Sequence, residues 1–488
     1  MSTLLTSRPQ PVAPIDLGTP RRLHVVGAGG PGMSAIALAL AQMGHDVSGV
    51  DLRDKQVLER LRAAGVSVQI GHAREHVDGC DAVTYSSAVP ADLNELDEAR
   101  RQGIPVLRRA GMLAAICAQA KSLGVAGAHG KTTTSSMLML MLAEAGQRPS
   151  FVIGGDVNDV GTGAQWTGGD QRGNNWFVVE ADESDGTHVE LPLHGTILTN
   201  VDRDHVDTEF GEGTLEGAVA SFDRYLAQTP GPKVVCADDE HAAALAARHD
   251  PATTVTYGLA EGARYRAVDV VAEQGTFSFA VARGGTVIAR VDLPLRGVHN
   301  VVNATGALAM AVELGVDPAV AAAALAKFGG VARRFDIRGA DAGATFVDDY
   351  AHLPAEIDAV LQAARQSGDG WQRVVAVFQP NRYNRMAQMW REYADAFTAA
   401  DVVVLTDIYP SGTQPIPGVT GRLVVQAVAA AHPSAHVVWL PRRDELVSYL
   451  ARTVRPGDVC VSMGCGDIAS LPDEVLAARR GPATVVPA

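Results

Sequence analysis

The segment 127–134, Gly-Ala-His-Gly-Lys-Thr-Thr-Thr, constrains the fold of this chain more than any other feature. It lies between a short apolar run, 123–126, and a run with helical periodicity, 135–145. A strand, a glycine-rich turn and a helix start predict an α/β unit whose turn offers backbone N–H groups to phosphate oxygens. Lys131 adds a charge for the outer phosphates and Thr132 a hydroxyl for Mg²⁺. An ordinary turn with a surface lysine would explain neither flank, so we predict a nucleoside triphosphate site.

The length and composition describe a globular protein with several cores. A chain of 488 residues suggests about three domains. No apolar run approaches the roughly 18 residues that a membrane helix needs, so we expect no membrane insertion. The polar, proline-containing residues 1–20 are predicted to be a disordered tail and not a signal peptide, which favours a cytoplasmic protein. Five cysteines without a CxxC pair are expected to be reduced thiols.

The acidic balance narrows the choice of partners. A formal net charge of −14 argues against nucleic acid or an anionic membrane surface as a partner. A polyphosphate ligand is still allowed, because helix N-termini, metal ions and a few arginines can hold it locally. The sequence does not predict the oligomeric state.

Short β-rich runs alternate with helical runs through most of the chain, which predicts parallel sheets. The first series covers residues 21–118, and the second, with an antiparallel patch at 264–295, covers 119–332. A third series occupies 333–488. The fold class predicted is therefore α/β, with three domains joined near residues 118 and 333.

A second glycine-rich turn, GAGGPG at 27–32, follows the first predicted strand, and Asp51 ends the second. This spacing is typical of dinucleotide binding, with a close backbone approach to a pyrophosphate and a carboxylate for a ribose. Any nucleotide with a pyrophosphate could make the same contacts, so the ligand of this turn could be NAD or another nucleotide. Hydroxyl and backbone donors in SSAVP (86–90) are candidates for the same ligand, although the segment also suits an ordinary turn.

Carboxylates gather after two predicted strands of the second domain. EADESD (180–185) follows a buried-looking strand, and strand alternation would place Glu180 and Asp182 on one side, with Glu183 apart. DRDH (202–205) follows another strand and includes His205. Carboxylate oxygens beside the glycine-rich loop are suitable ligands for Mg²⁺, and the two clusters together favour a site with two metal ions. The alternative interpretation is that EADESD is an acidic loop exposed to solvent.

Three later segments carry groups suited to a nucleotide or an acid. Asn300 and Asn303 are placed on one side of a helix, where amides can bind a base or cap the helix. RRF (333–335) lies at a domain joint, where an arginine can reach a developing phosphoryl charge. DDYAH (348–352) and FQPNRYNR (378–385) combine acids, imidazole and arginines, although surface ion pairing is the default for each alone.

Taken together and in this order, the segments resemble the Mur ligases of peptidoglycan synthesis. The resemblance spans nearly the whole chain, and its joint specificity is high. The motifs that carry it are GAGGPGMS (27–34), SSAVP (86–90), HGKTTT (129–134), EADESD (180–185), DH (204–205), HNVVNA (299–304), RRF (333–335), DDYAH (348–352) and FQPNRYNR (378–385).

The resemblance implies an N-terminal Rossmann-like domain for a UDP-sugar, a central P-loop ATPase domain and a C-terminal Rossmann-like domain. It also implies ATP-dependent formation of an amide between UDP-N-acetylmuramate and L-alanine, with Mg²⁺ and through an acyl phosphate. On this basis the N-terminal glycine turn would bind the UDP end of the sugar nucleotide instead of NAD.

The resemblance assigns the binding and catalytic residues as follows. ATP is assigned to Gly127, Ala128, His129, Gly130, Lys131, Thr132, Thr133, Asn300, Asn303, Arg334 and Asp349. The UDP-sugar is assigned to Gly27, Gly29, Gly30, Gly32, Met33, Asp51, Ser86, Ser87 and His129. The metal is assigned to Thr132, Glu180 and His205. Catalysis is assigned to Lys131, Glu180, His205 and Arg334. The amino acid and acyl phosphate are assigned to His352, Arg382 and Arg385.

Several residues depart from the family pattern, and three other functions compete with this one. Ala128 replaces a threonine, while Leu353 and Asn381 replace histidines near the expected amino-acid pocket. Alanine is the expected amino acid, with glycine and serine as alternatives. The competing functions are a ligase of the same family that adds a recycled peptide, a catalytically silent nucleotide sensor, and an NAD-dependent oxidoreductase, which would leave the P-loop unexplained.

Overall fold

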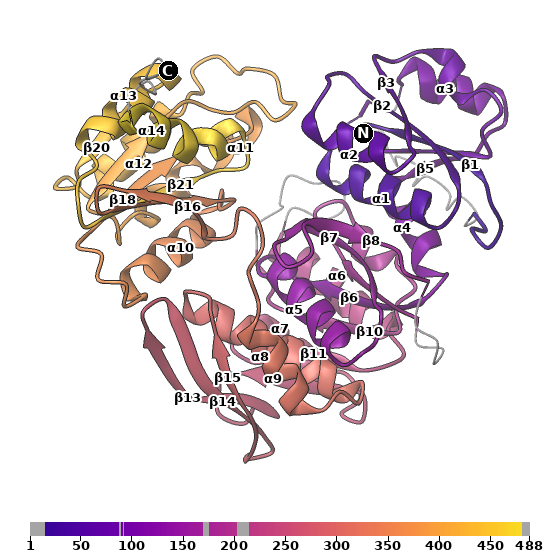
Figure 1. The fold of residues 1–488 in the computed structure, drawn as a ribbon, viewed down its shortest axis with the longest axis horizontal. Helices are drawn as coiled ribbons and strands as arrows, with labels where there is room; N and C mark the ends of the chain where they lie inside the picture. Colours follow the sequence, from indigo (N-terminus) through magenta and orange to yellow (C-terminus); the bar gives the residue numbers. More distant parts are fainter. Residues whose placement is uncertain (1–14, 87–88, 91, 169–174, 203–213, 481–488) are drawn as a thin grey trace, which may run out of the picture.

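The computed structural model describes residues 15–86, 89–90, 92–168, 175–202 and 214–480. They form three domains, each built on its own sheet. Figure 1 shows the N-terminal and C-terminal domains as two upper lobes above the central domain. The predicted α/β fold with three domains is confirmed. No helix within the described ranges has the length and hydropathy needed to cross a membrane.

The N-terminal domain has a parallel five-stranded sheet in the order β3-β2-β1-β4-β5. The order reverses between β1 and β4, so the loops after these strands open on one crevice, as in nucleotide-binding folds. The strands are β1 (Arg22–Val26), β2 (Asp46–Asp51), β3 (Ser67–Ile70), β4 (Ala82–Tyr85) and β5 (Val106–Arg108). The α-helices are α1 (Pro31–Gln42), α2 (Gln56–Ala63), α3 (Asn94–Arg101) and α4 (Arg109–Cys117).

The central domain is built on a sheet ordered β15-β14-β13-β12-β11-β10-β6-β9-β7-β8. The strands from β12 to β7 run parallel, and the predicted antiparallel patch is found in β13, β14 and β15. The strands are β6 (Lys121–Ala126), β7 (Ser150–Val157), β8 (Thr162–Gln165), β9 (Trp176–Glu180), β10 (Gly195–Leu198), β11 (Lys233–Cys236), β12 (Thr254–Gly258), β13 (Tyr265–Glu273), β14 (Thr276–Arg283) and β15 (Thr286–Leu293). The α-helices are α5 (Lys131–Glu144), α6 (Leu215–Gln228), α7 (Glu240–Ala246), α8 (Val298–Glu313) and α9 (Pro318–Ala326).

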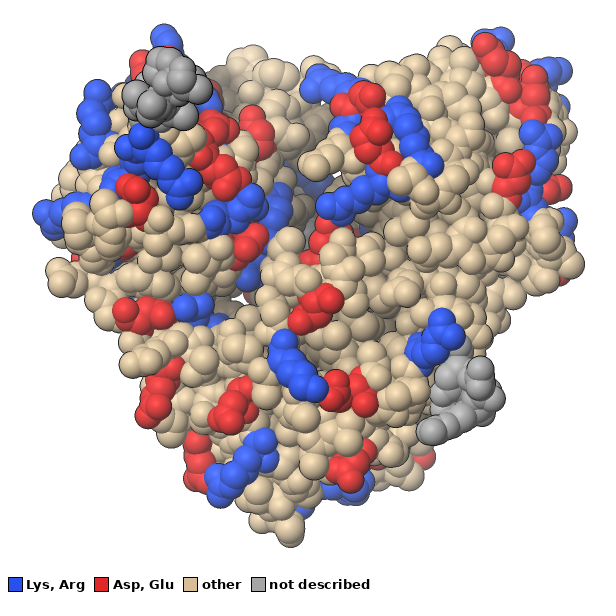
Figure 2. Space-filling model, viewed as in Figure 1, with Lys and Arg blue, Asp and Glu red and all other residues tan. Residues whose placement is uncertain are grey.

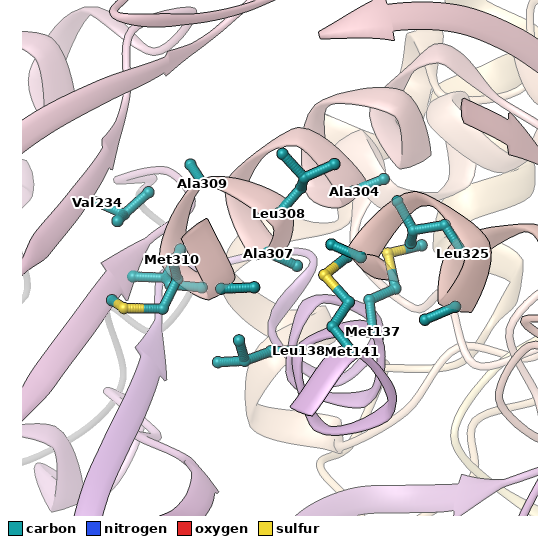
Figure 3. Close-up of a cluster of buried hydrophobic side chains, with 14 of the residues drawn as sticks. Met137, Leu138, Met141, Val234, Ala304, Ala307, Leu308, Ala309, Met310 and Leu325 are labelled. Atoms are coloured by element: carbon teal, nitrogen blue, oxygen red, sulfur yellow. The ribbon is translucent and has the colours of Figure 1, made fainter. Parts of the chain in front are cut away.

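The helix that follows the glycine-rich loop is fixed by the core of the central domain. Figure 3 shows α5, α8 and α9 packed together through Met137 and Met141 of α5, Leu308 of α8 and Leu325 of α9. These side chains are at most 1% exposed. Burial of such side chains supplies the main favourable free energy of folding, so the core holds the start of α5 in place.

The C-terminal domain has a sheet in the order β16-β17-β21-β18-β19-β20, parallel except for the β16–β17 pair. Apolar clusters cover both faces of this sheet. The strands are β16 (Asp336–Asp341), β17 (Ala344–Asp349), β18 (Arg373–Phe378), β19 (Val402–Leu405), β20 (Val437–Trp439) and β21 (Asp458–Met463). The α-helices are α10 (Pro354–Gln366), α11 (Tyr383–Met389), α12 (Arg422–Ala431), α13 (Arg443–Thr453) and α14 (Leu471–Arg480).

Four strands and part of the tail differ from the sequence-based expectation. The edge strands β8 and β16 carry no apolar run, Gly154 and Gly155 interrupt the pattern of β7, and β12 lies just before the antiparallel patch predicted from residue 264, so none of the four was predicted. The predicted tail, 1–20, overlaps the described residues at 15–20, where Leu17 is buried against the N-terminal domain. The packed chain therefore begins before residue 21.

Candidate active site

The glycine-rich loop joins β6 to α5 at the carboxyl edge of the central sheet, as predicted. Gly127 and Gly130 have φ of +131° and +82°. A Cβ on Gly127 would lie 2.1 Å from Oγ1 of Thr199, and one on Gly130 would lie 2.6 Å from Oδ1 of Asn303. Glycine is therefore required at both positions. No described side chain caps the first N–H groups of α5, so these groups face the space where the loop would bind phosphate.

Asn200, which the sequence analysis did not select, pins the loop from the end of β10. Its Oδ1 accepts from the N–H of His129 at 2.8 Å, and its Nδ2 donates to the carbonyl of His129 at 3.0 Å. Thr199 Oγ1 donates to the same carbonyl at 2.6 Å. The loop conformation is thus determined by neighbouring strands before any ligand binds.

Lys131 is folded over the loop towards the acidic cluster. Its Nζ donates to the carbonyls of Gly127 and Ala128 at 2.6 and 3.1 Å, and to the carboxylate of Glu183 at 2.9 and 3.0 Å. Burial opposes its charge, but Glu183 and Asp182 raise the pKa of Lys131, so the ammonium group stays protonated. Burial, with a contribution from Asp182, raises the pKa of Glu183 to about 7 against the opposing effect of Lys131.

The acidic cluster is arranged differently from the prediction. Strand β9 ends at Glu180, so strand alternation does not extend to Asp182, and the expected pairing of Glu180 with Asp182 on one side does not apply. Glu183, expected to lie apart, is the carboxylate that contacts Lys131. The turn after the strand, and not the strand itself, directs these side chains.

Glu180 and Thr132 are brought together beside the paired glycines of β7. A Cβ on Gly154 would lie 2.5 Å from Oε2 of Glu180, and one on Gly155 would lie 3.5 Å from Cγ2 of Thr132. Oε1 of Glu180 is buried and accepts no hydrogen bond from the described residues. Carboxylate and hydroxyl oxygens are the ligands that Mg²⁺ prefers, and an orphaned buried oxygen fits a metal ligand. His205 lies outside the described residues, so its position relative to this pair is untested.

The N-terminal glycine turn has the geometry of a pyrophosphate site. Gly27 has φ of +79°, and the N–H of Gly29 donates to Oδ2 of Asp51 at 2.9 Å. A Cβ on Gly29 would lie 2.6 Å from that oxygen. The side chain of Met33 is buried in the core, so Met33 can offer a ligand only its backbone.

The remaining residues predicted for this turn lie around it. Gly30 caps α1, and Gly32 is in its first turn. The N–H of Ser86 donates to the carbonyl of Val26 at 3.2 Å, which places Ser86 beside the turn. Ser87 lies outside the described residues.

Arg109, at the start of α4, links this turn to the acidic cluster of the central domain. Its Nη1 lies 3.5 Å from Oδ2 of Asp182, and its Nε lies 3.8 Å from Oδ2 of Asp185. The same guanidinium lies 3.3 Å from where a Cβ on Gly32 would be. The N-terminal glycine turn and Lys131 are therefore connected through one arginine and one set of carboxylates. No sequence motif singled out Arg109.

Most of the predicted nucleotide residues meet in a cleft of about 290 Å³ between the central and C-terminal domains, whereas Gly127, Ala128 and Lys131 lie outside its lining. Arg296 and His299 also line the cleft. Burial, and to a lesser extent His129, lowers the pKa of His299 to about 4, so this ring is neutral. Predicted residues in the lining are His129, Gly130, Thr132, Thr133, Asn300, Asn303, Arg334 and Asp349.

Asn300 does not serve as the helix cap in this cleft. Helix α8 begins after Gly297, and the Nδ2 of Asn300 donates to the carbonyl of Arg296 at 2.7 Å. Oδ1 of Asn300 accepts from Nδ2 of Asn303 at 3.2 Å. The two amides therefore hold each other on one face of α8, as their spacing predicted.

The domain joint carries strained backbone and a buried carboxylate. Arg333 and Phe335 have φ of +63° and +46°, which is unusual for residues with side chains. Asp349 accepts from the N–H groups of Phe335 and Ala351, both at 2.7 Å. Burial raises the pKa of Asp349 to about 6, although Arg334 opposes this shift. The joint therefore sets the position of Arg334 at the cleft.

Glu356 of α10 reaches across the cleft to the P-loop. Its Oε1 lies 3.6 Å from Nδ1 of His129, and its Oε2 accepts from the N–H groups of His352 and Leu353 at 2.9 and 3.2 Å. Burial opposes ionisation, but His352, His129 and Arg334 lower the pKa of Glu356 well below its usual value. Glu356 was missed because a glutamate near a helix start suggests only capping.

The predicted amino-acid residues lie at the carboxyl edge of the C-terminal sheet. Arg385 is 2% exposed, and its Nη1 donates to Oδ1 of Asn381 at 3.1 Å. Arg382 has φ of +60°, another strained position. Burial lowers the pKa of His352, and Arg385 lowers it further against the effect of Glu356. Cys465 is near Arg385 and Arg382, which oppose the rise in its pKa that burial causes.

Most of the chain matches one protein family in three consecutive segments. Residues 22–121 match the Mur ligase family catalytic domain, 125–311 the Mur ligase middle domain and 333–466 the Mur ligase glutamate ligase domain. The chain is 41% identical over 458 residues to UDP-N-acetylmuramate–L-alanine ligase of Rubrobacter xylanophilus, covering 93% of this chain and 99% of that protein. It is 43% identical over 472 residues to the ligase of that name from Acidothermus cellulolyticus, covering 96% and 97%.

Solved structures share the fold. The UDP-N-acetylmuramate-alanine ligase of Thermotoga maritima superimposes with a TM-score of 0.79 and 27% identity, over 94% of this chain and 99% of that one. A murein peptide ligase from Psychrobacter arcticus gives a TM-score of 0.68 at 24% identity, over 95% and 100%. The second comparison concerns the fold alone.

Proposed function

Because the chain belongs to the Mur ligase family, we propose that it joins L-alanine to the carboxylate of UDP-N-acetylmuramate, converting ATP to ADP and phosphate in peptidoglycan synthesis. The observation that carries the proposal is the link from the N-terminal glycine turn through Arg109 and the acidic cluster to Lys131. The link supports a sugar-nucleotide site beside a triphosphate site. Cytoplasmic location is expected because both nucleotides are cytoplasmic substrates.

In the first step, the muramoyl carboxylate attacks the γ-phosphorus of ATP. A new C–O–P linkage forms, the bond to the β-phosphate oxygen breaks, and ADP leaves with the electron pair. The loop and the start of α5 orient the phosphates, and Lys131 stabilises the transferring group. Asn300, Asn303 and Asp349 would hold the nucleoside, and Arg334 would face the developing charge.

Thr132 and Glu180 are proposed to hold Mg²⁺, with His205 as a further ligand. The buried Oε1 of Glu180, unpartnered within the described ranges, fits this role. When bound, Mg²⁺ neutralises phosphate charge, which two approaching anions require.

In the second step, the neutral amine of alanine attacks the acyl carbon. The C–N bond forms, phosphate leaves with the electrons of the C–O bond, and the nitrogen releases a proton. His352, Arg382 and Arg385 are proposed to face the amino acid and the acyl phosphate. Asn381 holds Arg385, so it is our candidate for setting the choice among alanine, glycine and serine.

Isotope tracing tests this function. The protein is incubated with ATP, Mg²⁺, L-alanine and UDP-N-acetylmuramate labelled with ¹⁸O in its carboxylate. We expect one labelled oxygen in the released phosphate, and release that needs both co-substrates. Label that stays wholly in the sugar product would contradict the acyl-phosphate route.

The same assay separates the competing functions. A ligase of recycled peptides would release phosphate with a tripeptide and not with alanine. A nucleotide sensor would bind ATP without release, and an oxidoreductase would respond to a nicotinamide nucleotide.

A further inference from the structure

We propose that the N-terminal domain binds a zinc-class divalent cation at a site formed by His24, His76 and Glu95. This site lies in a different domain from Thr132 and Glu180, which we propose to hold Mg²⁺, and it goes beyond the proposed ligase function. Its three side chains come from β1, from a short 3₁₀ turn (Arg74–Val77) and from the first turn of α3.

Burial removes the site from bulk solvent. The side chains of His24 and Glu95 are 0% exposed, and that of His76 is 15% exposed. Glutamate is rarely fully buried without a compensating partner. Three segments, distant in the sequence, therefore converge on one buried carboxylate.

The potential ligand atoms are near the separations found in a tetrahedral metal site. Nε2 of His24 lies 3.2 Å from Oε1 of Glu95, and Nδ1 of His76 lies 2.8 Å from the same oxygen. All three ligand atoms lie within 4.8 Å of one another. Bonds of about 2.0–2.1 Å to a tetrahedral zinc ion place neighbouring ligand atoms about 3.3 Å apart. Small side-chain shifts would therefore admit the ion.

Two further side chains orient these ligands in the way that metal sites require. Nδ1 of His24 lies 2.7 Å from Oγ of Ser48, which fixes the ring through the nitrogen that faces away from the site. Nδ1 of His72 lies 2.7 Å from Oε2 of Glu95, leaving Oε1 for the ion. Such outer contacts fix ring orientation and carboxylate direction around bound metals.

The ligand set determines the class of metal. Two imidazole nitrogens and one carboxylate suit Zn²⁺ and similar transition metals, whereas Mg²⁺ prefers oxygen ligands. A network of hydrogen bonds without a metal is the competing explanation, and metal binding decides between the two. His24 precedes Gly27 by three residues, so a bound ion would brace β1 just before the predicted UDP-sugar turn.

The experiment uses the full chain without an affinity tag. The protein is stripped with a chelator, mixed with Zn²⁺ in excess Mg²⁺, passed through a desalting column and analysed for bound metal. Glu180→Gln is used alongside the wild type, since it weakens the proposed catalytic metal site. We expect about one equivalent of zinc on both proteins, and Co²⁺ should give the intense visible absorption of a tetrahedral site.

Variants of the ligands provide the decisive comparison. Glu95→Gln and His76→Gln keep hydrogen-bonding groups but remove a ligand, and we expect each to bind zinc at least about tenfold more weakly. The matched control is His249→Gln, because His249 pairs with Asp223 at 2.9 Å in the central domain, away from the proposed zinc site. Circular dichroism checks that each variant is folded. Absence of zinc from both reference proteins, equal binding by the ligand variants, or equal loss in His249→Gln would overturn the proposal.

Discussion

The central domain shares one apolar core with the N-terminal domain, whereas it meets the C-terminal domain through a few polar contacts. On the N-terminal side a single buried cluster includes Leu23, Leu40 and Ile116 together with Phe177 and Leu193. Helix α1 packs on β7 and β8 of the neighbouring sheet. Two polar contacts also join these domains: an ion pair between Arg60 and Asp156, and a hydrogen bond from the N–H of Trp166 to the side chain of Gln42.

The C-terminal side is different in kind. Arg296 binds both oxygens of Asp369 at 2.7 and 3.0 Å and lies over the rings of Phe335 and Trp371. Among the described residues, the apolar clusters of the C-terminal domain include none from the central domain. The nucleotide cleft lies at this polar boundary.

The difference between the two boundaries indicates which of them can change when a ligand binds. Separating the apolar core would expose a large apolar area, so the N-terminal and central domains should move as one body. The polar boundary can exchange its contacts for water or ligand groups at little net free energy. Figure 2 shows a hollow between the N-terminal and C-terminal lobes, which leaves space beside the C-terminal domain. We expect substrates to act mainly on the position of the C-terminal domain.

The largest effect should come from the buried cation of the glycine-rich loop. Lys131→Ala is expected to lower kcat by about 10³-fold, or about 4 kcal/mol, because a preorganised charge beside the transferring phosphoryl group is lost. Phosphate release at saturating substrates measures this. Lys327→Ala is the control, since Lys327 forms an exposed pair with Glu144. A loss of less than about twofold for Lys131→Ala would contradict its assignment.

The apolar boundary can be tested by calorimetry. We expect one transition for the N-terminal and central domains together and a second for the C-terminal domain. Leu40→Ala should destabilise the first by about 3 kcal/mol, because it leaves a cavity in the shared core. Leu446→Ala is the matched control, since Leu446 is equally buried in a C-terminal cluster, and it should shift only the second. Separate transitions for the N-terminal and central domains would break the comparison.

The pH dependence of the C-terminal transition should report on Asp349. Its pKa in the folded protein, about 6, exceeds its ordinary 3.8, so between these values the folded state holds a proton that the unfolded state has lost. Above pH 6 the buried, ionised Asp349 therefore destabilises the folded state. This destabilisation decreases as the pH falls below 6 and the carboxylate takes up a proton. Relative to Asp349→Asn, the wild type should gain about 1.4 kcal/mol per pH unit between pH 6 and 4. Identical pH profiles of the two proteins would reject this.

The smallest effect is expected from the polar boundary itself. Arg296→Ala should lower the stability of the C-terminal transition by about 1 kcal/mol, the usual net value of such hydrogen bonds, and leave the first transition in place. Calorimetry of Arg296→Ala beside the exposed Arg22→Ala measures the difference. A loss as large as that of Leu40→Ala would show that the two boundaries do not differ.

The sequence predicted the backbone of the site better than its side chains. Both glycine turns and the helices after them are found where predicted, because Gly27, Gly127 and Gly130 are required by local geometry. The convergence of Asn300, Asn303, Arg334 and Asp349 on one cleft followed from the family resemblance, not from spacing alone.

Side chains that act across domain boundaries could not be predicted. Arg109, Glu356 and Arg296 gain their importance from partners 73, 227 and 73 residues away (Asp182, His129 and Asp369) in the sequence. Local pattern carries no information on such contacts. The Glu183–Lys131 pair was missed for a nearer reason, since a turn replaced the strand on which the alternation argument depended.

His129 of the glycine-rich loop lies between two carboxylates that belong to different domains. Nε2 of its ring lies 3.4 Å from Asp202, and Nδ1 lies 3.6 Å from Glu356 of the C-terminal domain. The imidazole resonances of this one residue should therefore differ between docked and undocked states of the C-terminal domain. With selective isotope labelling of histidine, the NMR signals of His129 would report on domain closure without an attached dye or spin label.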